Sequence, residues 1–236
     1  MRLFAGIDLI SERIPDETTI LTFRHLLEKQ GFGEQIFDAV TARMKGRDMA
    51  LKMGTIVDAN LIAAPSSTKN NARKRDPEMH LTKKGNQWSF GMKVHIGVGK
   101  DTGLIHSVMT TAANVHDLTP VAELLDGEEE VVYADAGYQG MEKRPEMEGL
   151  SALFRVAMRL GKRRALPDTP EGRLKNWVET AKAHIMAKVE HPFRVMKQPW
   201  ALRRHGCAMA KNRCKVKMMA AMTNLYLARR QRIATG

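Results

Sequence analysis

The chain opens with apolar residues at helical spacing. Residues 15–31 predict a helix that begins after Pro15, and residues 33–47 predict a second helix that ends near Gly46. The apolar positions of the first helix are Ile20, Leu21, Phe23, Leu26 and Leu27. We therefore expect a short helical region over residues 1–50, ahead of a main domain over residues 51–236.

From residue 54 the pattern changes to that of strands. Residues 54–65 are a short β-branched run that suits a strand buried on both faces. Residues 87–117 predict two strands that meet at a turn over residues 100–103, where Asp-Thr-Gly supplies turn chemistry. Further along the chain we expect a helix over 116–127, strands over 129–140 and 151–159, and helices over 169–199 and 210–232.

This order of elements predicts a mixed α/β fold. Three strands, a helix and two more strands, followed by helices, match the ribonuclease H-like arrangement, in which a mixed sheet of five strands is flanked by helices. In that topology the first and fourth strands lie side by side. Because one fold serves many functions, the chemistry has to be sought in particular side chains.

The charge balance narrows the class of partner. Lys and Arg number 38 against 26 Asp and Glu, which gives a net charge of +12 that is spread along the chain. Such an excess favours a polyanion, because basic groups that neutralise phosphates release counterions. No apolar run reaches the ~20 residues that cross a bilayer. The acidic start does not suit a signal peptide, and Cys207 and Cys214 lack metal-ligand spacing, so we expect a cytoplasmic protein.

Two aspartates interrupt apolar strands. Asp58 lies within TIVDANLI and Asp135 within VVYADAGYQG, where an ionised side chain is costly to bury without a partner. Each could be a cap or a turn residue. Because their strands would be neighbours, the two carboxylates could instead lie a few ångströms apart and repel each other, unless a divalent cation binds between them. Oxygen ligands of this kind suit Mg²⁺ or Mn²⁺.

A third carboxylate is sought in the long helical segment, which offers Glu179 and Glu190. Glu179 reads as a solvated helix charge with Lys175 or Lys182 at helical spacing. Lys197 lies two turns beyond Glu190 on the same face of the helix, from which it could reach a phosphate beside a metal. We therefore favour Glu190.

The motifs VDANLI, TKKGNQWSFGMKVHIGV, TAANVHD, YADAGYQG and KVEHPFRVMK together resemble the DDE transposases of bacterial insertion sequences, in particular the insertion-sequence-five type. The resemblance covers residues from about 15 to 230. It implies that Asp58, Asp135 and Glu190 are the catalytic and metal-binding triad, with Lys197 as the basic residue that closes the family's signature. Two Mg²⁺ ions, or Mn²⁺ in their place, would be the cofactors.

The same resemblance implies an activity and its partners. Water attacks the phosphodiester at a transposon end, and the freed 3′-hydroxyl then attacks target DNA without a covalent protein–DNA intermediate. The partners would be double-stranded DNA, both terminal inverted repeats and target, and a second copy of the chain in a synaptic dimer. Residues 1–50 would be the remaining part of a DNA-binding or multimerisation segment, and the protein would act at the nucleoid rather than at a membrane.

The family's signature has a Tyr and an Arg seven and four residues before the Glu, where this chain has Ala183 and Met186. A substitute cation is expected from Lys182, Lys188 or His184. An alternative hypothesis is a transposase relict that binds DNA without cleaving it. A third is a structure-specific nuclease, which would cut branched DNA without a joining step.

A polar, basic loop over residues 66–86 follows the first acidic strand and is expected beside DNA at the metals. Trp88 could stack on a splayed base, although aromatics such as Trp88 and Phe90 more often belong to a core. The residues expected to contact DNA are Arg73, Lys74, Arg75, Lys83, Lys84, Trp88, Arg194 and Lys197. Asp117 is expected to cap a helix rather than to bind metal, and His95 and His106 to hydrogen-bond within the sheet.

Overall fold

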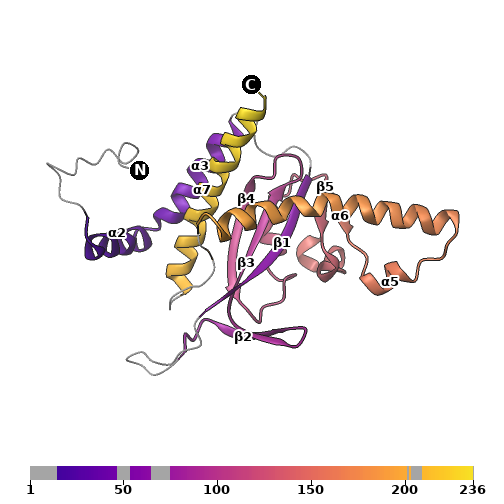
Figure 1. Ribbon diagram of the computed structural model, residues 1–236, viewed down its shortest axis with the longest axis horizontal. Helices are drawn as coiled ribbons and strands as arrows, with labels where there is room; N and C mark the ends of the chain where they lie inside the picture. Colours follow the sequence, from indigo (N-terminus) through magenta and orange to yellow (C-terminus); the bar gives the residue numbers. More distant parts are fainter. Residues whose placement is uncertain (1–14, 47–53, 65–74, 201, 203–208, 236) are drawn as a thin grey trace.

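The computed structural model describes residues 15–46, 54–64, 75–200, 202 and 209–235. Its elements surround one mixed sheet (Figure 1). The strands are β1 (Gly54–Ala63), β2 (His80–Lys84), β3 (Gln87–Gly99), β4 (Ile105–Ala112), β5 (Val131–Ala134) and β6 (Leu153–Val156). The helices are α2 (Glu17–Lys29), α3 (Phe32–Lys45), α4 (Val121–Leu124), α5 (Leu160–Arg164), α6 (Pro170–Lys197) and α7 (Met209–Thr235), with 3-10 turns η1 (Ala136–Tyr138), η2 (Met141–Lys143) and η3 (Pro145–Met147).

The sheet has the order β2-β3-β1-β5-β6, and β4 pairs with β3. The strands β2, β3, β4 and β1 form antiparallel pairs, whereas β1 with β5 and β5 with β6 are parallel. The mixed α/β, ribonuclease H-like arrangement expected from the sequence is thereby confirmed, including the pairing of the first acidic strand with the second. The expected number of five strands is wrong, because the described residues form six.

The additional strand is β2, which lies in the segment expected to be a polar loop. Its sequence, HLTKK, carries no apolar alternation, and Leu81 is largely exposed. It forms because its backbone pairs with β3 in a hairpin whose register joins Leu81 to Phe90 and Lys83 to Trp88. Hydrogen bonding to a neighbouring strand, rather than burial of side chains, therefore determines this element.

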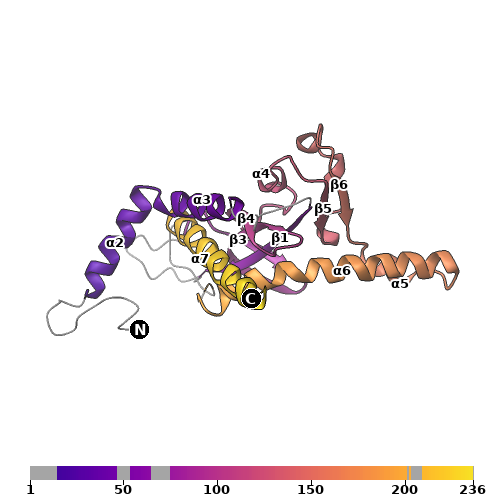
Figure 2. The same cartoon turned by 90° about the horizontal axis from the view of Figure 1, so that it is seen from above.

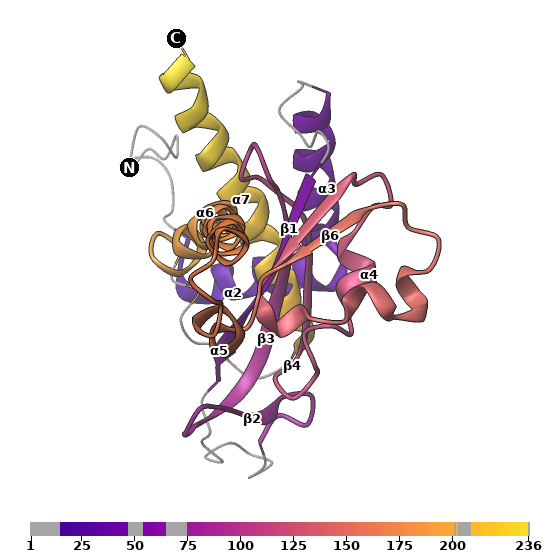
Figure 3. The same ribbon diagram turned by 90° about the vertical axis from the view of Figure 1, so that its right-hand side faces the viewer.

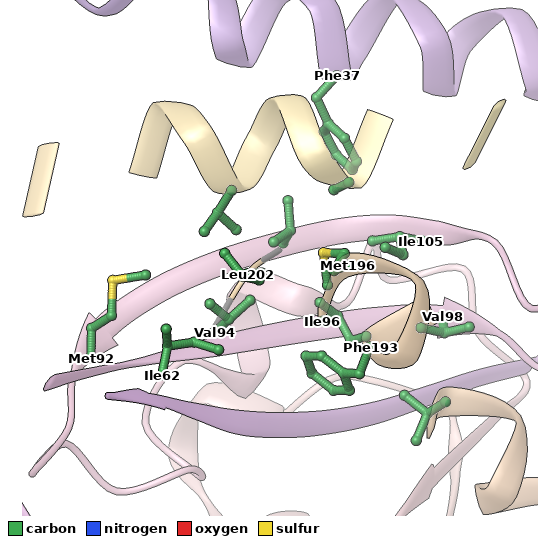
Figure 4. Close-up of a cluster of buried hydrophobic side chains, with 14 of the residues drawn as sticks. Phe37, Ile62, Met92, Val94, Ile96, Val98, Ile105, Phe193, Met196 and Leu202 are labelled. Carbon is green, nitrogen blue, oxygen red and sulfur yellow. The ribbon is translucent and has the colours of Figure 1, made fainter. Parts of the chain in front are cut away.

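Two layers of helices cover the sheet (Figure 2). On one face, Val189, Phe193 and Met196 of α6 pack on Ile56 and neighbouring residues of β3, and α7 and Phe37 of α3 extend the same cluster (Figure 4). The spacing of the three α6 residues is the helical repeat that the sequence displays. This packing fixes the C-terminal half of α6 across the middle of the sheet.

On the opposite face, α4 and the turns after β5 cover a smaller cluster that contains Val57, Val132, Ala134 and Tyr138. The helix α4 is shorter than the helix expected over residues 116–127, because it begins only at Val121 after Pro120. The segment before it is a series of turns. Residues 54–57 of β1 are therefore buried between two layers, as the β-branched run predicts.

The buried Asn224 joins α7 to β4. Its side-chain oxygen accepts a hydrogen bond from the Ile105 backbone N–H at 2.8 Å, and its side-chain nitrogen donates to the Ile105 carbonyl at 2.7 Å. Both backbone groups lie at the start of β4, where the pairing with β3 shifts register. A single buried amide thus satisfies a donor and an acceptor that the sheet leaves unpaired.

Candidate active site

Asp58 and Asp135 lie side by side at one end of a parallel ladder. The last pair between β1 and β5 joins Val57 to Ala134, and the next residue on each strand is an aspartate. Strand β5 ends there, while β1 continues for several residues beyond it. The edge of β1 next to Asp58 is therefore free of β5, which gives the two side chains a shared space at the carboxyl end of the ladder.

Each aspartate is fixed by a backbone donor. The Asp58 Oδ1 accepts from the Ala59 N–H at 2.8 Å, and the Asp135 Oδ1 accepts from the Gly137 N–H at 2.8 Å. Asp135 is the N-cap of η1, so its side chain takes the position of a turn-capping residue. The local reading of Asp135 as a cap is correct, but it does not exclude a chemical role, because a carboxylate has further lone pairs for a ligand.

Asp58 is surrounded by negative charge. Burial raises the pKa of its carboxyl to about 7, the hydrogen bond from Ala59 opposes that rise, and the charges of Asp135, Glu190 and Asp117 add to it. Asp135 itself is exposed and Asp58 is half-buried. The structure therefore brings Asp58 near both other carboxylates of the expected triad, in an arrangement that a cation would stabilise.

Glu190, on α6, interacts electrostatically with Asp58. It is exposed and follows the buried Val189, and Lys197, half-buried in the last turn, lies seven residues further along the same helix. Among the described residues, however, no three His, Cys, Asp or Glu side chains lie close enough together to hold a metal ion. The three carboxylates are electrostatic neighbours, and their assignment as a metal-binding triad stays a prediction.

A fourth carboxylate, Asp117, lies beside the site, and the sequence reading missed its role. Asp117 does not cap α4, whose N-cap is Pro120. Its carboxylate pairs instead with the Lys93 Nζ at 2.8 Å, and the same ammonium donates to the Val115 carbonyl at 2.7 Å. Lys93 lies on β3, far from Asp117 along the chain. The residues around Asp117 in the sequence therefore could not predict this ion pair.

The buried phenol of Tyr138 belongs to the same region. Tyr138 follows Asp135 through η1, and its hydroxyl has no hydrogen-bond partner among the described residues. Burial raises the pKa of this phenol, and the nearby charges of Asp58, Asp117 and Asp135 raise it further. The phenol is therefore held in its neutral, protonated form in this acidic region.

The two sheet histidines behave as expected. The His95 Nε2 lies 2.8 Å from the Thr111 Oγ1, and the His106 Nε2 lies 3.2 Å from the Thr55 Oγ1, so each joins two strands. Burial lowers the pKa of both imidazoles to about 4. They are therefore neutral near pH 7 and serve as structural hydrogen-bonding groups.

Glu179 is not the solvated charge that its sequence context suggests. It is buried, and it binds the Lys182 Nζ at 2.7 Å and the Met158 backbone N–H at 2.7 Å. Lys182 also donates to the Val156 carbonyl at 2.9 Å. These contacts attach the chain that follows β6 to α6, so Lys182 is engaged here and not at Asp58.

The structure also shows the surroundings of Ala183 and Met186, which replace the Tyr and Arg of the family signature, and of the cations expected to substitute for them. Ala183 is exposed, and Met186 is partly buried against the main core. Lys188 donates to the Lys100 carbonyl at 2.9 Å, and His184 lines a surface pocket with it. Two of the three expected substitute cations, Lys182 and Lys188, are therefore occupied by other contacts.

The expected DNA-contact residues are distributed over two regions. Arg73 and Lys74 lie outside the described residues, as does the side chain of Lys84. At the β2–β3 hairpin, Arg75, which precedes β2, lies 5.5 Å from the Phe90 ring centre, and Lys83 of β2 lies 5.7 Å from that of Trp88. The exposed Arg194 lies on α6, where its Nε donates to the Gln198 Oε1 at 3.4 Å.

The two hairpin aromatics differ in environment. Phe90 is buried in the main core, whereas Trp88 is 63% exposed. The core interpretation is therefore right for Phe90 and wrong for Trp88. An indole on an exposed hairpin, next to a lysine, stays available for a nucleic-acid base.

The fold and the carboxylates at the end of its central parallel ladder define a ribonuclease H-like protein with an acidic site. A family model described as transposase DDE domain matches residues 50–225, which is most of the chain. The chain therefore belongs to the DDE transposase family. No solved structure matches it.

Proposed function

We propose that this protein is a transposase that cleaves the ends of its element and transfers the 3′-hydroxyl strand to target DNA. The observation that carries the proposal is the placement of Asp58 and Asp135 directly after the last residue pair of the β1–β5 ladder, with Glu190 close enough to raise the pKa of Asp58. The motifs around these residues support the insertion-sequence-five type within the family.

Asp58, Asp135 and Glu190 would hold two Mg²⁺ ions, for which Mn²⁺ can substitute. The donor set fits, because it consists of carboxylate oxygens, and a divalent cation would offset the like charges around Asp58. When bound, the ions supply stabilisation of the attacking and leaving oxygens at phosphorus. Glu190 would supply the third carboxylate ligand. Lys197 would neutralise a phosphate next to the one that reacts.

The reaction has two balanced steps. In the first, a water oxygen bonds to the phosphorus at the transposon end, the bond from phosphorus to the 3′ oxygen breaks, and the departing oxygen takes a proton. In the second, that 3′ oxygen loses its proton and attacks a phosphorus of target DNA, which displaces a target 3′-hydroxyl. The chain's own groups bind and orient the DNA, and they form no covalent bond to it.

The partners would be the terminal inverted repeats, target DNA and a second copy of the chain, and the place of action would be the cytoplasm, at the nucleoid. The domain division would be a helical segment over residues 1–50, acting in DNA binding or multimerisation, and a catalytic domain over residues 51–236. Within the described residues, no helix is both long and apolar enough to span a bilayer.

A cleavage and strand-transfer assay tests the proposal. DNA that carries the element's terminal repeats is incubated with protein in Mg²⁺, in Mn²⁺ and in EDTA. We expect nicking and joining only with metal, and we expect Asp58→Asn and Glu190→Gln to reduce both to the EDTA background. Glu171→Gln is the matched control, because it removes an exposed carboxylate from the same helix. Undiminished cleavage by Asp58→Asn would refute the triad.

The same assay separates the other functions. A relict is favoured by Ala183 and Met186 and by the engagement of Lys182 and Lys188 in other contacts. It would bind duplex DNA in a salt-sensitive manner and cleave it under no metal condition. A structure-specific nuclease would cut branched DNA and form no joined product.

A further inference from the structure

The N-terminal end of α6 and the neighbouring helix α5 project from the body of the molecule (Figures 1 and 2). This projection is rich in basic residues. We call residues 155–178 the basic arm. They comprise the end of β6, α5 and the first two turns of α6. Its exposed cationic residues are Arg155, Arg159, Lys162, Arg164, Arg173 and Lys175. Figure 3, which looks along α6, shows α5 packed next to that helix.

The arm is held by specific hydrogen bonds. The Arg163 Nε donates to the Asn176 Oδ1 at 2.8 Å, and its Nη2 donates to the Thr180 Oγ1 at 2.7 Å. The buried Glu179 binds the Met158 N–H at the base of the arm. These contacts attach α5 to α6, so the backbone that carries the exposed cations has a defined position relative to α6.

Most of the positive charge on the arm is not neutralised by the protein. Asp168 pairs with Arg173 at 2.7 Å, and Glu179 is occupied by Lys182. Within the described part of the chain, no ion pair forms at the other exposed cations, which are Arg155, Arg159, Lys162, Arg164 and Lys175. Cationic side chains that form no ion pair with the protein are free to bind the phosphates of a polyanion.

The arm begins at the same end of the sheet as the candidate active site. Strands β5 and β6 are parallel, and the last pair joins Ala134 to Val156, so the arm starts where Asp135 follows β5. The Gln139 side chain donates to the Ala157 carbonyl at 3.1 Å, which ties the two segments together. Both the carboxylates and the first residue of the arm therefore lie at one edge of the sheet.

The length of α6 sets the distance between the two sites. Asn176 and Thr180, to which α5 is bound, precede Glu190 by 14 and 10 residues of one continuous helix. At 1.5 Å per residue this is roughly 15–21 Å along the helix axis. Each strand of duplex DNA has a phosphate about every 3.4 Å, so the separation corresponds to about five base pairs.

We propose that the basic arm binds the backbone of duplex DNA about five base pairs from the phosphodiester that reacts at Asp58, Asp135 and Glu190. This inference rests on the proposed function for the place of the reacting phosphate. The contacts are to phosphates, so they position the duplex and do not read its sequence. The arm thereby extends the DNA-binding surface beyond the residues near the triad.

A competing occupant of the arm is a second copy of the chain. Leu174 and Trp177 of the same arm are 62% and 68% exposed, and such side chains can pack against protein. Charge favours DNA, because the whole chain carries a net charge of +12 and two copies of the arm repel each other. The test below includes the second copy as one of its outcomes.

The test measures duplex binding by fluorescence anisotropy over a series of salt concentrations in EDTA, so that no cleavage occurs. Lys162→Gln/Arg164→Gln is compared with wild type on a long duplex centred on the cleavage position. We expect the slope of log affinity against log salt to fall by about 1.8, at about 0.9 for each lost phosphate contact. Lys143→Gln/Lys215→Gln removes the same charge from exposed positions on η2 and α7, and we expect it to leave the slope within about 0.5 of wild type.

A short duplex locates the contact. On a hairpin-capped duplex with fewer than about four base pairs on either side of the cleavage position, the arm has no phosphate to reach, and variant and wild type should bind alike. An unchanged slope on the long duplex overturns the inference. A changed oligomeric state in sedimentation without a changed slope overturns it in favour of a second copy. Cleavage by Asp58→Asn would refute the proposed function and leave this binding result unaffected, so the two failures are distinguishable.

Discussion

Asp58 and Asp135 are register neighbours on two parallel strands, since each follows directly after the last pair, Val57 and Ala134, of the β1–β5 ladder. Main-chain hydrogen bonding thus places two carboxylates together before any side chain contributes. Asp58 carries the electrostatic consequence, because burial and the neighbouring charges hold the pKa of its carboxyl at about 7. Without a bound cation, ionisation of Asp58 in the folded protein is therefore unfavourable.

Metal-free stability should fall as pH rises from about 4 to about 7. The pKa of Asp58 is about 7 in the folded state and 3.8 in the unfolded state. Between these two values the carboxyl is therefore protonated in the folded state and ionised in the unfolded state. The unfolded state binds fewer protons there, so the free energy of unfolding decreases with pH, by at most roughly 4 kcal/mol.

Thermal unfolding in EDTA measures this effect. Asp58→Asn cannot ionise, so we expect its melting temperature to exceed that of wild type at pH 8 and to approach it at pH 4. Glu123→Gln, on α4, is a control that should retain the wild-type profile. If Asp58→Asn and wild type lose stability equally across the window, the raised pKa of Asp58 is wrong.

Removing the Tyr138 hydroxyl should stabilise the metal-free protein or leave its stability unchanged. The ring is buried in a core cluster, and the hydroxyl has no partner among the described residues, so Tyr138→Phe keeps the packing and removes a desolvated polar group. We expect a gain of zero to about 1 kcal/mol in urea unfolding. Tyr138→Ala, which also removes the ring, should cost roughly 3–5 kcal/mol. A loss above 1 kcal/mol for Tyr138→Phe would reveal a structural hydrogen bond at the hydroxyl.

Replacing Asn224 should weaken the contact of α7 with the edge of the sheet. Asn224→Leu leaves the Ile105 N–H and carbonyl buried without partners, and we expect a cost of roughly 2–4 kcal/mol in the free energy of unfolding. Leu225→Ala is the neighbouring control; its side chain is 55% exposed, so its cost should stay below about 0.5 kcal/mol. Equal stability of the two variants would show that the amide contributes nothing.

Glu179→Gln should destabilise the protein, because Glu179 is buried although its helix is rich in charged residues. Burial raises the pKa of Glu179, but the hydrogen bonds from Lys182 and Met158 outweigh it and leave that pKa below its ordinary value. The stabilisation is therefore present at neutral pH and is lost as pH falls through the lowered pKa. Because the mostly buried Lys182 would lose its carboxylate partner and keep only the Val156 carbonyl, the expected cost at pH 7 is roughly 3 kcal/mol.

Urea unfolding at pH 7 and pH 3 tests this, with the exposed Glu171→Gln as the matched control. The difference between Glu179→Gln and wild type should shrink at the lower pH. A cost as small as that of Glu171→Gln at pH 7 would mean that Glu179 is solvated, as its sequence context alone suggests.

Glu179 and Glu190 show where sequence reasoning ends. Eleven residues are about three helical turns, so periodicity places both on one face of α6 and does not distinguish them. What differs is the chain above each: Met158 and Lys182 cover Glu179, whereas Glu190 lies open near Asp58. Burial of a helix residue depends on its tertiary neighbours, and these come from a segment that helical spacing does not include.

By itself, the sequence determined most of the strands and helices, the mixed α/β class and the two aspartates that interrupt apolar strands. Those features follow from β-branched runs, helical repeats and turn residues, which act over a few neighbouring positions. Only the tertiary structure decided that β2 joins the sheet, that Lys93 pairs with Asp117, and that the charges of Asp58 and Asp135 act on the buried Tyr138. The physical reason is that each of these depends on a contact across strands or layers, where burial and hydrogen bonding, rather than local pattern, fix the outcome.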